Sequence, residues 1–295
     1  MTEPIPQWLK TLVAQNKAAL RSARGLATDS AITGQALHTV CHEALCPNRG
    51  KCFSNGEATF LILGNICTRG CKFCAVGKAK PMPPDPQEPD KIAALIRDWK
   101  LSYAVITSPT RDDLPDGGAW QFAATLNSIR STAPATLVEP LIPDFKGEAA
   151  SLKTVLDANP AVLAHNMETV PRLYASVRSG ADYARSLKLI ETAKRLRPDV
   201  PVKSGIMLGL GEEHEEIETV LKDLVNNGCD LLTLGQYLAP SKNHFPVARY
   251  VEPQEFDEWH AKALAAGFKA AACGPLVRSS YMAGELYAAY KGSKK

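Results

Sequence analysis

Residues 58–74 read ATFLILGNICTRGCKFC and join a short apolar run to three closely spaced cysteines. The run at 58–64 ends in a glycine, which predicts a short buried strand that stops there. Cys67, Cys71 and Cys74 follow in the spacing C-x3-C-x2-C, beginning three residues beyond the run. We therefore expect this set, called the second trio below, to lie in a loop that leaves a strand.

The same pattern of a short apolar run followed by a helical segment repeats along the rest of the chain. Further candidate strands lie at 103–108, 135–140, 161–166, 202–210, 231–238 and 268–273. Helical patterns lie at 90–100, 120–131, 149–158, 182–195, 212–227 and 253–266. Repeated strand-helix units predict an α/β fold with a parallel sheet, and six or seven units fit a closed or partial barrel. An open doubly wound sheet is the structural alternative.

The segments outside these repeats differ in character. Residues 1–57 carry no strand-helix unit and predict a helix-rich N-terminal extension. Residues 79–89 hold five prolines, which predict an extended connection rather than a helix or a central strand. We expect a division into this extension, an α/β barrel at 58–273 and a C-terminal segment at 274–295.

Bulk properties narrow the class of protein. The chain has 295 residues, 45% of them hydrophobic, and a formal net charge of +3, which is too small for a nucleic-acid-binding footprint. The first ten residues lack the features of a signal or transit peptide, and no apolar run approaches the length of a membrane span. These features predict a cytoplasmic protein without membrane attachment, where clustered cysteines are more often metal ligands than disulfides.

A first trio of cysteines precedes the second. Cys41, Cys46 and Cys52 have the spacing C-x4-C-x5-C, so six of the eight cysteines lie between positions 41 and 74. A structural zinc site needs four protein ligands, whereas an iron-sulfur cubane held by three cysteines keeps one iron open. Two sets of three therefore favour iron-sulfur clusters. The alternative is a zinc site completed by a distant histidine or cysteine.

The fourth ligand of the first trio is open on residue type alone. Cys229 and Cys273 carry the natural donor atom, and His38 and His42 follow because imidazole can replace thiolate on iron. Both cysteines have apolar neighbours in sequence, however, and a lone cysteine in such a context is usually a small buried hydrophobe.

The second trio, with an aromatic residue before its last cysteine and a strand before its first, resembles the radical S-adenosylmethionine (SAM) superfamily. The resemblance implies that SAM chelates the open iron and is cleaved to a radical that abstracts hydrogen from an unactivated carbon. Asn166 and Glu168 follow a candidate strand and are our candidates for binding the SAM ribose. Arg185 is a candidate for the methionine carboxylate or the ribose, an exposed helix arginine being the alternative.

A second resemblance covers most of the chain, from about Val40 to Ala283. The strings that carry it are CHEALCPNRGKC at 41–52, CTRGCKFC at 67–74, RDDLPDGG at 111–118, HNMET at 165–169, GQYLAPS at 235–241 and GPLVRSSY at 274–281. Together they are similar to the lipoyl synthase family. The resemblance implies a partial (β/α)6-type radical SAM barrel and two [4Fe–4S] clusters, one that binds SAM and one auxiliary.

The lipoyl synthase resemblance also implies roles for single residues. Ser280 is implied as the fourth ligand of the auxiliary cluster on the first trio, and Arg278 as a neighbour that steers cluster and substrate charge. The implied reaction is the insertion of two sulfur atoms, taken from the auxiliary cluster, at C6 and C8 of an octanoyl chain on a carrier lysine. A serine oxygen is harder than thiolate and more readily displaced from iron, which suits a cluster that is consumed.

The implied partners are an octanoylated lipoyl carrier domain or glycine cleavage H-type protein, a low-potential electron donor such as ferredoxin or flavodoxin, and a carrier that repairs the cluster. Nucleic acid and membrane are not expected partners. One rival interpretation is another radical SAM enzyme that inserts sulfur or transfers electrons through its second cluster. A rival from a different class is a non-catalytic iron-sulfur carrier or a zinc-stabilised binding protein.

Overall fold

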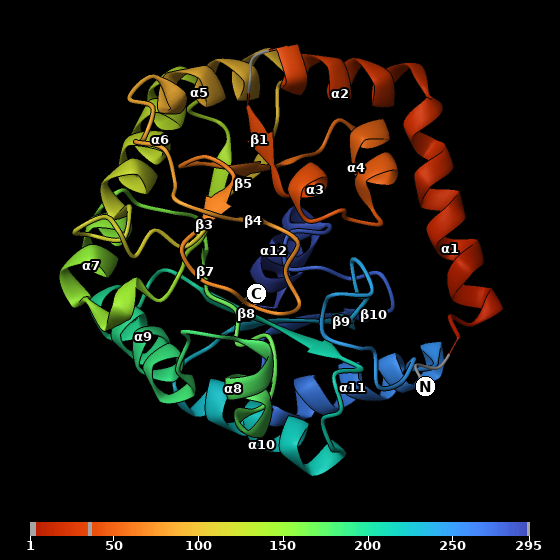
Figure 1. The fold of residues 1–295 in the computed structure, drawn as a ribbon. Helices are drawn as coiled ribbons and strands as arrows, with labels where there is room; N and C mark the ends of the chain where they lie inside the picture. Colours follow the sequence, from red (N-terminus) through yellow and green to blue (C-terminus); the bar gives the residue numbers. More distant parts are fainter. Residues whose placement is uncertain (1–3, 35–36, 294–295) are drawn as a thin grey trace. The chain divides into compact units, whose positions relative to one another are not determined.

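A computed structural model describes residues 4–34 and 37–293 of the chain (Figure 1). The chain divides into two compact units, and each is described by itself. The N-terminal unit comprises Thr11–Arg69 and Ala75–Ala161, and the C-terminal unit comprises Met1–Lys10, Gly70–Cys74 and Val162–Lys295. The division into 1–57, 58–273 and 274–295 that we expect from the sequence stays a prediction.

The N-terminal unit contains a set of mostly parallel strands. Its strands are β1 (His38–Thr39), β2 (Thr59–Leu61), β5 (Tyr103–Thr107) and β6 (Leu137–Leu141), with β3 (Ile66–Cys67) and β4 (Gly77–Lys78) forming a separate parallel pair. β2, β5 and β6 are parallel neighbours, and β1 pairs antiparallel with β2. Parallel strands need crossover connections, and the helices described next supply them.

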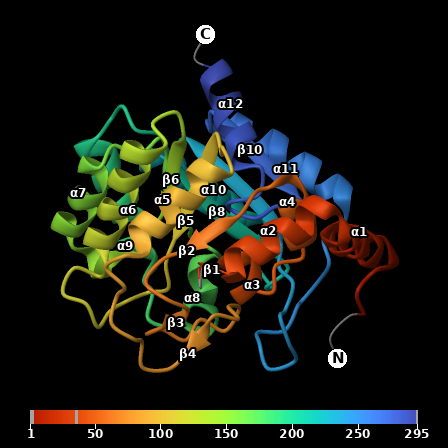
Figure 2. The ribbon, with the colours of Figure 1, turned by 90° about the horizontal axis from the view of Figure 1, so that it is seen from above.

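The helices of this unit fall into two groups. The crossover helices are α5 (Glu88–Asp98), α6 (Ala119–Thr132) and α7 (Ala149–Asp157), and they pack side by side (Figure 2). The extension contains α1 (Gln7–Ala18), whose first four residues belong to the other unit, α2 (Ala23–Gly34), α3 (Val40–Glu43) and α4 (Arg49–Asn55), with a 3-10 turn at Ala19–Arg21. The predicted helix-rich character of 1–57 is confirmed for its described residues.

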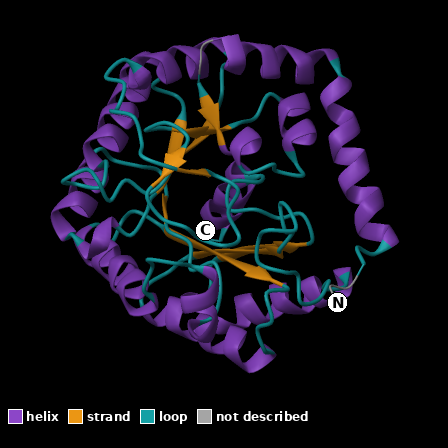
Figure 3. Ribbon diagram, in the orientation of Figure 1, coloured by secondary structure: helices purple, strands orange, loops and turns teal. Residues whose placement is uncertain are grey.

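The C-terminal unit has its own parallel strands. They are β7 (Leu163–Ala164), β8 (Val202–Leu208), β9 (Leu231–Gln236) and β10 (Ala270–Gly274), neighbours in that order. Its helices are α8 (Tyr174–Val177), α9 (Tyr183–Leu196), α10 (His214–Asn226), α11 (Pro253–Ala266) and α12 (Ala283–Gly292). Figure 3 shows α9, α10 and α11 lying along one face of these strands.

Helix α10 illustrates how local sequence sets the elements. Ile217, Val220, Leu221 and Leu224 are fully or almost fully buried, as their helical spacing predicts. The carboxylate of Glu216 accepts a hydrogen bond from the backbone N–H of Glu213, the residue before the helix, at 2.9 Å. Apolar periodicity and an N-terminal acidic residue therefore act together to fix the start and the buried face of the helix.

Seven candidate strands and six candidate helices from the sequence are present, with boundaries shifted by a few residues. One prediction was wrong at its edge. The extended connection predicted at 79–89 ends at Gln87, because Glu88 and Pro89 lie in the first turn of α5. A proline is tolerated there, since backbone N–H groups in the first turn make no intrahelical hydrogen bond. The strands do not close into a barrel in either unit. Among the described residues, no helix has both the length and the apolar character needed to cross a bilayer.

Candidate functional site

The chain leaves β2 through a tight turn before it reaches the second trio. Leu63 and Gly64 both have left-handed backbone angles, with φ of +67° and +81°. Cys67 ends β3 and is partly buried. Its Sγ lies 3.4 Å from the backbone nitrogen of Arg69, which donates a hydrogen bond to it. The first cysteine of the loop therefore has a backbone donor aimed at its sulfur.

A buried arginine holds the chain on both sides of the second trio. Arg111 is 1% exposed and donates to the carbonyl oxygens of Leu63 and Met82, both at 3.0 Å. Its guanidinium also forms a two-bonded pair with Asp113, at 2.9 and 2.8 Å. These hydrogen bonds hold the pKa of the Asp113 carboxyl below its usual range, although partial burial opposes the shift. One side chain thus connects residues 63 and 82, which flank the trio in sequence.

The other two cysteines of the second trio belong to the C-terminal unit. Backbone hydrogen bonds order their segment: Lys72 donates to the carbonyl of Val177 and accepts from the N–H of Phe245, both at 2.8 Å. The N–H of Cys74 bonds to the carbonyl of Cys71 at 3.2 Å, which makes a tight turn. Both thiols are partly buried. Backbone hydrogen bonds therefore order this segment, and the thiol of Cys71 also donates to the carbonyl of Ser179 at 3.9 Å.

The first trio lies on two short helices of the N-terminal unit. Cys41 is in α3 and Cys52 is in α4, while Cys46 lies in the connection between them. The backbone N–H of Cys46 bonds to the carbonyl of Cys41 at 3.3 Å, and the N–H of Cys52 bonds to the carbonyl of Asn48 at 2.9 Å. All three cysteines are therefore tied to a local helical framework.

Burial and neighbouring cysteines both affect the thiols of the first trio. Burial, and next the neighbouring Cys46, raises the pKa of the Cys41 thiol to about 12. Burial, followed by Cys41 and Cys46, likewise raises the pKa of Cys52. Neighbouring thiolates repel one another, and burial makes their charge more costly still, so the deprotonated form is unfavourable unless a cation is bound. A bound metal cluster would relieve that repulsion, so this donor set fits one.

The histidines considered as fourth ligands are engaged elsewhere. The Nε2 of His42 lies 2.7 Å from Asp29, and its Nδ1 lies 2.8 Å from the hydroxyl of Thr39, so both ring nitrogens have partners. The Nδ1 of His38 lies 3.3 Å from Glu43. His42 therefore supports α3 rather than offering a nitrogen to iron.

Of the two remaining cysteines, Cys229 is buried, as its interpretation as a small core hydrophobe predicts, whereas Cys273 is partly exposed. The thiol of Cys229 donates to the carbonyl oxygens of Val202 and Leu231 at 3.6 and 3.4 Å. Cys273 lies in β10, and burial raises the pKa of its thiol to about 12. Cys229 packs between strands as a small hydrophobe with a weak hydrogen bond.

Within residues 4–34 and 37–293, no three His, Cys, Asp or Glu side chains converge closely enough to hold a single metal ion. This finding concerns a single metal ion bound by one close set of side chains. It does not conflict with a cubane, because each cysteine of a cubane binds a different iron and the sulfurs lie farther apart.

Asn166 and Glu168 are brought together beyond the end of β7. The side-chain nitrogen of Asn166 donates to a carboxylate oxygen of Glu168 at 3.0 Å and to the hydroxyl of Ser279 at 2.6 Å. The side-chain oxygen of Asn166 is buried and has no hydrogen-bond partner. A Cβ built on Gly205 would lie only 2.9 Å from that oxygen, so the glycine leaves space in front of it. A buried acceptor beside such a gap fits a ligand hydroxyl.

Glu168 has an unusual backbone and an unusual charge environment. Its φ is +67°, a left-handed conformation that is uncommon for glutamate, and it pairs with Ile206 of β8 in an isolated parallel bridge. Burial raises the pKa of its carboxyl, while Arg178, Asn166 and Arg278 oppose the shift. Strain and a perturbed carboxyl in one residue are typical of functional sites.

The segment after β10 lies against the strands of the same unit. The ammonium group of Lys203, on β8, is 1% exposed and donates to the carbonyl of Ser279 at 2.8 Å. A Cβ on Gly235 of β9 would clash with the carbonyl of Val277 at 2.1 Å, so this glycine permits the close approach. The neighbouring Arg278 and Ser280 are partly buried. Their roles stay predictions.

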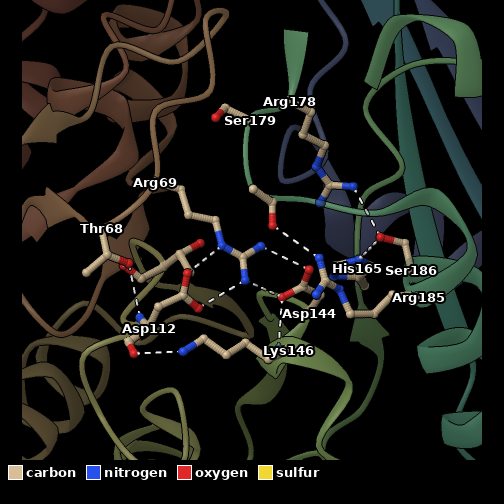
Figure 4. A network of polar contacts seen from close by, with 12 residues as sticks. Thr68, Arg69, Asp112, Asp144, Lys146, His165, Arg178, Ser179, Arg185 and Ser186 are labelled. Atoms are coloured by element: carbon tan, nitrogen blue, oxygen red, sulfur yellow. Dashed lines mark hydrogen bonds and ion pairs between the residues drawn. The ribbon is translucent and has the colours of Figure 1, made fainter. Parts of the chain in front are cut away.

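Arg185 lies in the first turn of α9. Its backbone N–H bonds to the Asp182 carboxylate at 2.7 Å, and its guanidinium donates to the carbonyl of Gly180 at 3.1 Å. Nearby on the same unit, Ser186 meets His165 at 3.1 Å and Arg178 at 3.3 Å (Figure 4). The guanidinium is partly buried, which disfavours the simple exposed-arginine alternative.

Several residues of this site were missed from the sequence. Glu212 accepts hydrogen bonds from the backbone N–H groups of Gly209 and Leu210 at 2.6 and 2.8 Å, which holds the strand exit after β8. Lys203 was missed as well, although a lysine inside a long apolar run is a signal for a buried, paired charge. Arg69 was missed for want of any local signal.

Comparison with protein-family models finds a match to the Radical SAM superfamily over residues 61–224, more than half of the chain. Relatives with higher similarity are described as lipoyl synthases. The one from Mannheimia succiniciproducens is 53% identical over 94% of this chain and 86% of its own length. The one from Trichlorobacter lovleyi is 55% identical over 94% of this chain and 96% of its own.

Solved structures with a similar fold share little sequence with the chain. Streptococcus suis SuiB bound to precursor peptide SuiA matches with a TM-score of 0.58 and 12% identity, over 77% of this chain and 52% of that chain. Methylornithine synthase matches with a TM-score of 0.54 and 15% identity, over 90% and 80%. At this identity the likeness concerns the fold alone. It agrees with the predicted α/β radical SAM architecture, with a mostly parallel sheet that is not closed.

Proposed function

The chain belongs to the lipoyl synthase family of the radical SAM superfamily, whose members are sulfurtransferases, and we propose that it inserts two sulfur atoms into a carrier-bound octanoyl chain. The insertion is assigned to C6 and C8 of an octanoyl group on a carrier lysine. One observation carries the proposal. The chain combines both cysteine trios and the Arg278–Tyr281 string with 53% identity to a lipoyl synthase over 94% of its length.

Each insertion replaces one C–H bond with one C–S bond. A saturated carbon has no acidic proton and no leaving group, so protein acids and bases cannot activate it. When bound, the cluster of the second trio supplies the electron that cleaves SAM to methionine and a 5′-deoxyadenosyl radical, and the auxiliary cluster supplies the sulfur. Two SAM molecules and two electrons are consumed for each lipoyl group, which yields two methionines and two 5′-deoxyadenosines.

The residues around the second trio would bind and orient SAM. Cys67, Cys71 and Cys74 hold three irons and leave the fourth for SAM. Asn166 and Glu168 would receive the ribose hydroxyls, because Asn166 has a buried oxygen without a partner and Glu168 offers a carboxylate beside it. Arg185 would meet the methionine carboxylate or a ribose oxygen.

The first trio would hold the auxiliary cluster with Ser280 as its fourth ligand. Cys41, Cys46 and Cys52 would supply the thiolates, and burial followed by the neighbouring cysteines raises the pKa of Cys41 and of Cys52 in the cluster-free chain. A serine oxygen is a harder ligand than a thiolate, so Ser280 would be the protein ligand most readily displaced from iron. Arg278 would neutralise negative charge next to it.

The proposed partners follow from the reaction. The substrate is a lipoyl carrier protein, either a lipoyl carrier domain or a glycine cleavage H-type protein, whose octanoyl-lysine must reach both clusters. A low-potential donor such as ferredoxin or flavodoxin would deliver the two electrons, and an iron-sulfur carrier would restore the consumed cluster. These requirements fit a reducing compartment, and we propose the cytoplasm.

The test is anaerobic reconstitution of the purified protein, followed by reaction with reductant, SAM and an octanoylated carrier. We expect 5′-deoxyadenosine to form and the carrier mass to change by the addition of two sulfurs and the loss of two hydrogens. A Cys67→Ala variant should form neither product. The matched control Cys229→Ala, at a buried cysteine outside both trios, should retain both. Absence of 5′-deoxyadenosine from the reconstituted parent protein would refute the proposed function.

A further inference from the structure

The N-terminal unit contains a buried charge network centred on Arg69, which lies inside the second trio (Figure 4). The Arg69 guanidinium donates two hydrogen bonds to Asp112, at 2.7 and 3.0 Å. It donates two more to Asp144, at 2.9 and 2.7 Å. One planar cation therefore joins two carboxylates that are 43 and 75 residues away in sequence. Such a fork-shaped arrangement fixes orientation as well as distance.

Arg69 and Asp144 form the buried part of the network, while the side chain of Asp112 is 26% exposed and Lys146 lies at the surface. The side chain of Arg69 is 8% exposed and that of Asp144 is 0% exposed. Burial disfavours the arginine charge, but the hydrogen bonds that the guanidinium donates to Asp144 and Asp112 outweigh burial and raise its pKa above the ordinary value. Lys146 adds a second positive charge, and its ammonium donates to the carbonyl of Asp112 at 3.0 Å. Because a buried ion pair contributes little net stability, stability alone does not explain this network, and a role in fixing geometry is the alternative.

The backbone around Arg69, at residues 67–69, is also held by hydrogen bonds. The backbone N–H and the hydroxyl of Thr68 both donate to the carbonyl of Thr110, at 3.0 and 2.9 Å. The hydroxyl in turn accepts from the N–H of Asp112 at 3.0 Å. The backbone at 67–69 is thus attached to the loop after β5, and the guanidinium attaches it to the turn after β6 as well.

This attachment acts on a cysteine sulfur. The backbone N–H of Arg69 donates to the Sγ of Cys67, so the anchored guanidinium and the N–H···S bond belong to the same residue. Hydrogen bonds to a cluster thiolate stabilise the reduced state and raise its reduction potential. Rotation of the Arg69 peptide would remove that bond.

We propose that Arg69 is a positioning residue for the second trio. Its ion pairs with Asp112 and Asp144 fix the loop at Cys67 and keep the backbone N–H of Arg69 directed at the Cys67 sulfur. The inference rests on the proposed assignment of Cys67 as an iron ligand. Arg69 touches neither SAM nor substrate in this account. It arranges the loop before a cluster binds, and it lowers the entropic cost of bringing Cys67 to iron.

The test uses the full-length chain with Cys41, Cys46 and Cys52 changed to serine, so that only the second cluster contributes iron and spectra. In this background we compare the parent with Arg69→Gln, Arg69→Lys and Arg97→Gln after anaerobic reconstitution. Arg97 is a matched control, because it pairs with Asp98 on the exposed face of α5, with side chains 55% and 56% exposed. Iron and sulfide content, the midpoint potential and the electron paramagnetic resonance spectrum with and without SAM are measured.

We expect Arg69→Gln to lose severalfold in iron bound per chain, and the remaining cluster to have a lower midpoint potential and a weaker spectral response to SAM. Arg69→Lys keeps the charge without the fork, so it should bind iron almost fully and still show a lowered potential. Arg97→Gln should match the parent in every measurement. Parent-like iron content, potential and SAM response in Arg69→Lys and in Arg69→Gln would overturn the inference.

Two further outcomes separate this inference from its premise and from misfolding. If Cys67→Ala in the same background binds a normal cluster, the assignment of Cys67 itself is wrong. If Arg69→Gln fails to fold by circular dichroism, Arg69→Lys decides, because it preserves the charge balance with Asp112 and Asp144. A folded Arg69→Lys protein with a parent-like potential and SAM response would then overturn the inference.

Discussion

The first trio of cysteines lies on short helices, whereas the second lies on a loop that leaves a strand. In the first, Cys41 and Cys52 are held by α3 and α4, whose backbone hydrogen bonds are satisfied locally. In the second, Cys67 is held through side chains, by Arg69 and Arg111, which reach residues far away in sequence.

The difference has a chemical meaning under the proposed function. A cluster that is consumed and rebuilt needs a framework that survives without it, and the backbone hydrogen bonds of α3 and α4 provide one. A cluster that transfers an electron to SAM needs a fixed geometry and a tuned potential, and directed donors provide these. Five substitutions, each with its own measurement, test whether the two trios have these different roles.

The largest effect is expected from replacing one cysteine of each trio. Cys67→Ala should abolish 5′-deoxyadenosine formation, because the cluster that cleaves SAM loses a ligand. Cys41→Ala should abolish sulfur insertion but keep SAM cleavage, since the second trio is intact. Chromatography of 5′-deoxyadenosine and mass spectrometry of the carrier measure the two outcomes separately. Loss of SAM cleavage in a folded Cys41→Ala protein would break the proposed division.

The next effect concerns SAM affinity at the strand ends. Asn166→Ala removes the buried oxygen that we assign to a ribose hydroxyl, and the loss of such a hydrogen bond costs about 1–3 kcal/mol, or roughly 5- to 150-fold in Kd. Equilibrium binding of SAM to the reconstituted protein measures it. Asn127→Ala, at an exposed position of α6, is the control and should bind SAM normally. Equal affinity in both variants would remove Asn166 from the SAM site.

A smaller effect is expected at the proposed labile corner of the auxiliary cluster. Ser280→Cys should keep the iron content but slow sulfur insertion severalfold, because a thiolate leaves iron less readily than a serine oxygen. Single-turnover formation of lipoylated carrier is the measurement, and Ser131→Cys on the surface of α6 is the control. An unchanged insertion rate in Ser280→Cys would mean that the oxygen ligand has no functional role.

The smallest effect is a pH-dependent change in stability near the second trio. The pKa of Asp113 is lowered in the folded chain by Arg111, so its contribution exists above the unfolded pKa of about 3.9 and disappears as pH falls through the lower folded value. Asp113→Asn should therefore destabilise the protein by about 1 kcal/mol at pH 7 and by less near pH 3. The value at pH 7 is small because Asp113 is partly exposed and solvent screens its pair with Arg111.

Thermal unfolding of the cluster-free protein, followed by circular dichroism at both pH values, measures this change as roughly 2 °C at pH 7. Asp98→Asn, which removes an exposed pair with Arg97, should change the midpoint by less. An Asp113→Asn protein as stable as the parent at pH 7 would show that Arg111 holds its two carbonyls without its carboxylate partner.

Much of the fold was predictable because it is encoded locally. Apolar runs located seven strands, and the helical spacing of residues such as Val220 and Leu224 located α10. The short strands β1, β3 and β4 were not predicted, because two residues carry too little pattern to detect. The cysteine trios were predictable from their spacing alone.

The supports of the two trios were not predictable, for a physical reason. Arg69 and Asp144 are 75 residues apart, so only the fold brings them together. The residue type of His42 allows an iron ligand, but in the structure its two ring nitrogens contact Asp29 and Thr39. The proposed ligand role of Ser280 rests on family resemblance alone, since a serine in a turn has no distinguishing local signal.

In the proposed reaction, the first trio holds the cluster that supplies sulfur to the octanoyl chain. The most direct measurement is a single turnover of protein reconstituted with ³⁴S-sulfide, followed by mass spectrometry of the carrier. The account predicts that both inserted sulfurs carry the label and that Cys41→Ala yields no lipoylated carrier. Insertion of unlabelled sulfur by the labelled protein, or lipoylation by Cys41→Ala, would contradict it.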